Sequence, residues 1–232
     1  MERLGTWPTE CIFCHTPEIT DEHVFAKKWM RELIPKGSGE MMVAQVDKGR
    51  DPVVRFYRTR DVDVIARCVC GDRCNSGWMN NMDERTQPLL APLVASLNRV
   101  ALTPEDQRRL ATWATKLAIV LDYSTTTDEA EADARPLGVV KEPVHRYFYE
   151  ERLPPDYVHV WLAAQKDPEP PVLSIAGGNQ APRPTLMGVP LLGAKRHQMY
   201  VATFRVNHAI FQVFIPDLTR TGSPSEGGSM TS

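Results

Sequence analysis

The sequence predicts an α+β protein with three parts: a cysteine-rich metal-binding module, a helical middle and a C-terminal antiparallel sheet. All five cysteines lie at or before Cys74. Apolar residues then recur at three- and four-residue spacing, which is typical of helices, and alternate with polar residues after Pro155, which is typical of strands. The expected boundaries are 1–97 for the module, 98–216 for the helical and sheet region, and 217–232 for a disordered tail of small polar residues.

The bulk composition is that of an ordinary globular protein. Hydrophobic residues make up 42% and charged residues 24%, and the formal net charge of -2 gives no overall electrostatic footprint for nucleic acid. No stretch approaches the roughly 20 apolar residues that cross a bilayer, and the N-terminus lacks the pattern of a signal peptide. We therefore expect a cytoplasmic protein without membrane contact. In that compartment thiols stay reduced, so its cysteines are expected to bind metal rather than form disulfides. Its oligomeric state is not predicted by the sequence.

Two tight cysteine clusters predict a structural zinc site. Cys11 and Cys14 are separated by two residues, a spacing that lets both thiolates turn toward one ion. The second cluster holds Cys68, Cys70 and Cys74. Cys68 stays open as an alternative to Cys70, because residues two apart on a strand share a face. The ligands expected for Zn²⁺ are Cys11, Cys14, Cys70 and Cys74.

An acidic residue directly precedes a histidine between the two cysteine clusters, at Glu22 and His23. Histidine titrates near neutral pH and can take a proton from water. A neighbouring carboxylate can hold a hard divalent cation such as Mg²⁺. This dyad is therefore a candidate catalytic site beside the zinc site.

These motifs, taken in order, resemble the HNH endonuclease family, whose site is a ββα-metal fold within a zinc-bound treble clef. The resemblance covers about residues 11–90 and lies in three stretches: Cys11-x-x-Cys14, Glu22-His23-Val24-Phe25, and Cys74-Asn75-Ser76-Gly77-Trp78-Met79. It implies a metal-dependent endonuclease that hydrolyses the phosphodiester bonds of DNA, with a zinc-bound treble clef as the N-terminal module.

The resemblance also implies roles for three residues. His23 falls on the general base that activates water, and Glu22 falls on the preceding ligand of the catalytic metal. Asn75 falls on the position at the start of the helix that completes this second metal site, which would hold Mg²⁺ or Mn²⁺. The metal would bind the scissile phosphate and stabilise the departing 3′ oxygen, leaving a 5′ phosphate and a 3′ hydroxyl.

The sequence departs from the family pattern at the middle asparagine, which orients the catalytic histidine. No asparagine lies between Asp47 and Cys70, so Asp61 or Asp63 would have to substitute. Asp83 returns to the Asn75 face two helical turns later and is a candidate third metal ligand. These departures keep an alternative open, namely a catalytically inactive, zinc-stapled scaffold or nucleic-acid-binding protein.

Two helices are expected after the cysteines. Apolar residues from Met79 to Leu97 predict the first, with Pro88 kinking or dividing it. The second begins at Thr103, a natural N-cap, with Pro104 at the first position and Asp106 where a capping box places an acid. One apolar face is expected along it, formed by Leu110, Trp113, Ala114, Leu117, Ala118 and Leu121.

Period-two alternation predicts the strands of the C-terminal sheet. The expected strands are 158–163, 171–175, 185–189, 198–206 and 209–215, separated by Gly, Pro and Asn. A third hypothesis is that this sheet holds the main activity, but it shows no nucleophile–base pair and no glycine-rich phosphate loop.

Overall fold

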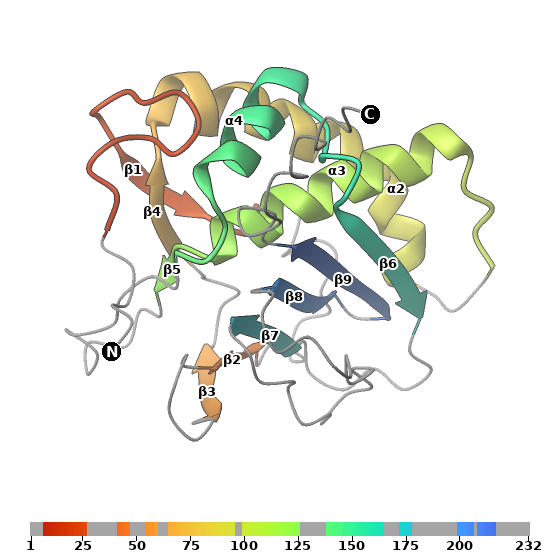
Figure 1. The fold of residues 1–232 in the computed structure, drawn as a ribbon. Coiled ribbons are helices and arrows are strands. Elements are labelled where there is room, and N and C mark those ends of the chain that lie inside the picture. Colours follow the sequence, from red (N-terminus) through yellow and green to blue (C-terminus); the bar gives the residue numbers. More distant parts are fainter. Residues whose placement is uncertain are drawn as a thin grey trace, which may run out of the picture.

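The computed structural model describes residues 7–26, 41–46, 54–59, 65–95, 99–125, 138–164, 172–177, 199–206 and 208–216. It is an α+β structure, in which the helix α3 (Pro104–Leu121) lies between a three-stranded sheet and a six-stranded sheet (Figure 1). Several sequence-based predictions lie outside the described residues: the strand at 185–189, the tail 217–232, and the two acids Asp61 and Asp63.

The three-stranded sheet joins the N-terminal segment to the second cysteine cluster. Its strands are β1 (Thr20–His23), β4 (Ile65–Val69) and β5 (Ser124–Thr125), in the order β1-β4-β5. β1 and β4 are antiparallel, with Glu22 opposite Ala66. The sheet therefore brings the Glu22-His23 dyad beside the strand that leads into Cys70.

The six-stranded sheet has the order β3-β2-β7-β8-β9-β6. Its strands are β2 (Met41–Val46), β3 (Val54–Thr59), β6 (His159–Ala164), β7 (Val172–Gly177), β8 (Met199–Val206) and β9 (Ala209–Pro216). The four C-terminal strands pair antiparallel to one another, which confirms the predicted antiparallel sheet. β2 pairs parallel with β7, so the segment between the cysteine clusters adds two strands to this sheet and makes it mixed.

The helix after the second cysteine cluster breaks at Gly77 rather than at Pro88. A wide, π-type helix η1 (Gly71–Met79) is followed by α2 (Asn80–Ala95), which runs on through Pro88 and Pro92. Gly77 has φ -92° and ψ -111°, and a Cβ built there would lie 3.1 Å from the carbonyl oxygen of Asp72. Of the two predicted effects of Pro88, dividing the helix was wrong, because α2 is continuous through it, whereas a kink there stays a prediction. The backbone breaks instead at Gly77, where the missing Cβ permits a close approach.

The predicted capping box at Thr103 is confirmed at the start of α3 (Pro104–Leu121). The Asp106 backbone N–H donates to Thr103 Oγ1 at 3.2 Å, and the Thr103 N–H donates to Asp106 Oδ2 at 3.1 Å. From Thr112 to Leu121 every side chain of α3 is buried, not only the expected apolar face. A helix buried all round lies in the centre of a protein.

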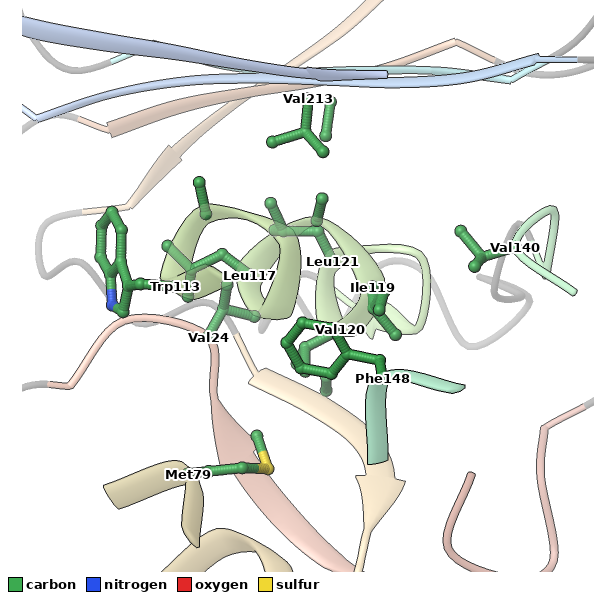
Figure 2. Close-up of a cluster of buried hydrophobic side chains, with 14 of the residues drawn as sticks. Val24, Met79, Trp113, Leu117, Ile119, Val120, Leu121, Val140, Phe148 and Val213 are labelled. Atoms are coloured by element: carbon green, nitrogen blue, oxygen red, sulfur yellow. The ribbon is translucent and has the colours of Figure 1, made fainter. Parts of the chain in front are cut away.

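The hydrophobic core surrounds α3. Figure 2 shows Val213 of β9 on one side of this helix, and Val24, Phe148 and Met79 on the other. Phe148 belongs to the last helix, α4 (Glu142–Glu151), which lies on the same side of α3 as the small sheet, whereas α2 packs against α3 (Figure 1). Within the described residues, no helix combines the length and the apolarity that crossing a membrane requires.

Candidate functional site

The first cysteine pair lies on a tight turn that is attached to strand β4. The Cys11 N–H donates to the Thr16 carbonyl at 2.8 Å, and the His15 N–H donates to the Cys11 carbonyl at 2.9 Å. His15 closes the turn with a left-handed backbone (φ 56°), and its ring pairs with Glu10 at the surface. These bonds hold the turn in a single geometry, with both cysteine side chains on it.

The second pair lies where β4 gives way to η1. Cys70 precedes the first residue of η1, and Cys74 lies within it. Gly71 lets the chain turn here against Thr20, since a Cβ would lie 3.1 Å from Thr20 Cγ2. The Ile12 N–H donates to the Cys68 carbonyl at 2.9 Å, which joins the two cysteine segments.

The four sulfur atoms of Cys11, Cys14, Cys70 and Cys74 all lie within 4.8 Å of one another. The Cys11 and Cys74 sulfurs are 3.7 Å apart, and the Cys14 and Cys70 sulfurs are 3.3 Å apart. Four thiolates bound tetrahedrally at about 2.3 Å from zinc would have their sulfurs about 3.8 Å apart. The four cysteines therefore lie close enough to bind one metal ion, and they are the four expected from the sequence.

Contact between two of these thiols shifts their pKa values in opposite directions. Contact with the Cys74 thiol lowers the pKa of Cys11 to about 4, and the same contact raises the pKa of Cys74. Burial raises the pKa of Cys70. Metal ions bind thiolates and displace such protons, so affinity for an ion at this cluster would increase with pH.

Cys68 does not join the cluster. Its side chain is fully buried, and burial raises the pKa of this thiol well above its ordinary value. The alternative of Cys68 in place of Cys70 is thereby decided in favour of Cys70, which belongs to the group of four close sulfurs. Cys68 packs in the apolar core as a small hydrophobic residue does.

Beside the cysteines, the structure brings Glu22 and Asn75 together. Glu22 is 4% exposed, and its carboxylate is hydrogen-bonded to the Asn75 side chain. Burial raises the pKa of Glu22 to about 7, and the nearby Asp83 raises it further, while Lys116 and Asn75 oppose this rise. Glu22 is thus a buried carboxylate whose charge is not fully compensated by its neighbours.

Asp83 has partners that the sequence did not predict. Its Oδ1 accepts a hydrogen bond from Lys116 Nζ at 2.6 Å and another from Trp113 Nε1 at 3.0 Å. Lys116 is 1% exposed and Asp83 is 6% exposed, so this is a buried ion pair between α2 and α3. We call Glu22, Asn75, Asp83, Trp113 and Lys116 the polar cluster.

His23 lies on the other face of β1. Neighbouring residues of a strand point to opposite faces, and Glu22 is buried while His23 is half-buried. The two dyad residues are thus neighbours on the strand with different exposure. On the outer face, Asp21 accepts a hydrogen bond from Arg67 at 2.7 Å.

Sequence reasoning missed Lys116 and assigned Trp113 to apolar packing alone. The signal was present, because Lys116 is the one charged residue in the stretch of α3 from Trp113 to Leu121, which is apolar except for Thr115. Lysine is almost never fully buried without a partner. A lysine inside an apolar run therefore indicates a buried acid elsewhere in the fold, although the sequence does not say which acid.

No family model, curated protein or solved structure matches the chain. The function of the protein is therefore inferred from its residues and their geometry.

Proposed function

We propose that the protein is a metal-dependent endonuclease of the HNH type, which hydrolyses DNA phosphodiester bonds. One observation supports this proposal above the others: Glu22 on β1 is hydrogen-bonded to Asn75 beside the cysteine cluster, and His23 follows Glu22 directly. β1 and β4 are antiparallel, and β4 leads into η1. Two antiparallel strands followed by a helix, with four cysteines at their junction, agree with a zinc-bound treble clef.

The two proposed metal sites differ in their donor chemistry. Four thiolates suit Zn²⁺, which would join the cysteine turn to the start of η1 and act structurally. A carboxylate and an amide oxygen suit a hard cation such as Mg²⁺ or Mn²⁺, and the incompletely compensated charge of Glu22 is one that such a cation would balance. The residues present therefore fit both ions.

In this proposal, His23 takes a proton from a water molecule, whose oxygen then attacks the phosphorus. The bond from phosphorus to the 3′ oxygen breaks, and that oxygen takes a proton from a solvent water molecule and leaves as the 3′ hydroxyl. Glu22 and Asn75 would hold the divalent ion, which would supply Lewis-acid stabilisation of the phosphate and of the leaving oxygen.

A plasmid-nicking assay with Mg²⁺ or Mn²⁺ tests this proposal. His23→Ala should lower cleavage at least about 100-fold, the usual contribution of a general base. His159→Ala is the matched control, since His159 is exposed on β6 in the other sheet and should leave cleavage unchanged. Zinc content, measured on each protein, shows that the module is intact. Zinc-loaded wild type that cleaves neither duplex nor single-stranded DNA would refute the proposal.

A second candidate is a zinc-stapled scaffold or nucleic-acid-binding protein without catalysis. The observation that favours it is the Lys116–Asp83 ion pair, which places a cation within the polar cluster without any metal. A zinc-loaded protein that shifts DNA in a gel but does not cleave it would support this candidate.

A further inference from the structure

A lysine at the centre of α3 lies beside the proposed catalytic metal site. Its ammonium group is 2.6 Å from Asp83 Oδ1, and its electrostatic influence reaches Glu22. A lysine that is 1% exposed must be paired, because an isolated buried ammonium loses its hydration without compensation. Lys116 therefore occupies, within the fold, a position that a cation would otherwise take.

The partners of each carboxylate in the polar cluster are different. Asp83 Oδ1 already accepts from both Lys116 and Trp113, whereas Glu22 is bonded to the neutral side chain of Asn75. Two carboxylates and one ammonium leave a single negative charge in the cluster. The available negative charge is thus that of Glu22, and Asp83 is neutralised by its own lysine.

We infer that Lys116 is a resident counter-ion that withholds Asp83 from the divalent ion, so that this cluster offers the ion only Glu22 and Asn75. The inference rests on the proposed function, since it concerns the same metal site. Lys116 acts through Asp83 and is a positioning residue: it sets how many carboxylates the ion meets and how tightly the ion binds. Because the affinity of oxygen-ligand sites increases with the number of charged ligands, removing the ammonium group should strengthen binding.

The test measures binding of Mn²⁺ alone to the zinc-loaded full chain, by the electron paramagnetic resonance signal of free Mn²⁺. Wild type is compared with Lys116→Met, which keeps an unbranched side chain, one atom shorter, without the charge. The double variant Lys116→Met with Asp83→Asn removes both charges of the pair and is the matched control. Glu22→Gln removes the proposed metal ligand.

Lys116→Met should bind Mn²⁺ at least about tenfold more tightly than wild type, and the double variant should return to the wild-type affinity. A folded Lys116→Met protein with unchanged or weaker affinity overturns the inference. A double variant that keeps the increase also overturns it, because Asp83 would then not be the added ligand. If Lys116→Met is unfolded without metal, added Mn²⁺ should restore a folded protein that unfolds cooperatively. Failure of Mn²⁺ to restore folding refutes the inference.

The same measurements separate this inference from the proposed function. If wild type binds no Mn²⁺ and Glu22→Gln behaves in the same way, the metal site of the proposed nuclease is refuted. In that case, Mn²⁺ binding by Lys116→Met that disappears in the double variant would still establish Lys116 as the counter-ion of Asp83.

Discussion

The stability of the protein should fall as the pH rises from about 4.5 to about 7, because of Glu22. Burial raises the pKa of this carboxyl from its ordinary value of 4.5 to about 7, so the folded state binds more protons than the unfolded state across this interval. Stability decreases with pH wherever the folded state holds more protons. Below pH 4.5 the group is neutral in both states and makes no difference. Above pH 7 Glu22 is ionised in both the folded and the unfolded state, and its burial then lowers the free energy of unfolding by about 3 kcal/mol.

Glu22→Gln removes this titration while keeping a hydrogen-bonding side chain. The variant should exceed wild type in free energy of unfolding by about 3 kcal/mol at pH 8 and by about 1 kcal/mol at pH 5. Urea unfolding without added Mg²⁺ or Mn²⁺ measures both values. Asp21→Asn, at the exposed neighbouring position of β1, is the control and should keep the wild-type pH dependence. Equal pH dependence for wild type and Glu22→Gln would refute the reasoning.

Two further predictions concern the zinc site and the central helix. Cys70→Ala should abolish zinc binding and Cys68→Ala should keep it, because only Cys70 belongs to the group of close sulfurs. Elemental analysis of the purified variants measures the zinc content of each. Loss of zinc from Cys68→Ala alone would contradict the assignment. Thr103→Ala should lower the free energy of unfolding by about 1 kcal/mol, because the N-cap hydrogen bond is lost. Thr103→Ser keeps the hydroxyl group and should keep the wild-type stability. An unchanged urea midpoint for the alanine variant would show that the cap does not contribute to stability.

Local patterns were sufficient for much of the fold. The capping box at Thr103 was predictable because its partner Asp106 lies three residues away. The strands β6, β8 and β9 were predictable because alternation of apolar residues reflects which face of a sheet is buried. Except for the choice between Cys68 and Cys70, the group of close cysteines followed from two short spacings, since a turn of two or three residues can direct two thiols to one point.

Other features depend on segments that are distant in the chain. The parallel pairing of β2 with β7 has no local signal, because each strand pattern is compatible with several partners. The break at Gly77, rather than at Pro88, reflects a backbone approach to Asp72 that composition does not reveal.

By itself, the sequence determined the α+β class, the helix cap, the two cysteine clusters and the position of the Glu22-His23 dyad between them. Only the tertiary structure decided between Cys70 and Cys68, turned His23 and Glu22 to faces with different surroundings, and paired Lys116 with Asp83. The physical reason is the separation along the chain of the residues that interact. Caps, turns and strand alternation arise between residues a few positions apart, whereas a buried charge selects its partner from whatever the packed core brings within hydrogen-bonding distance.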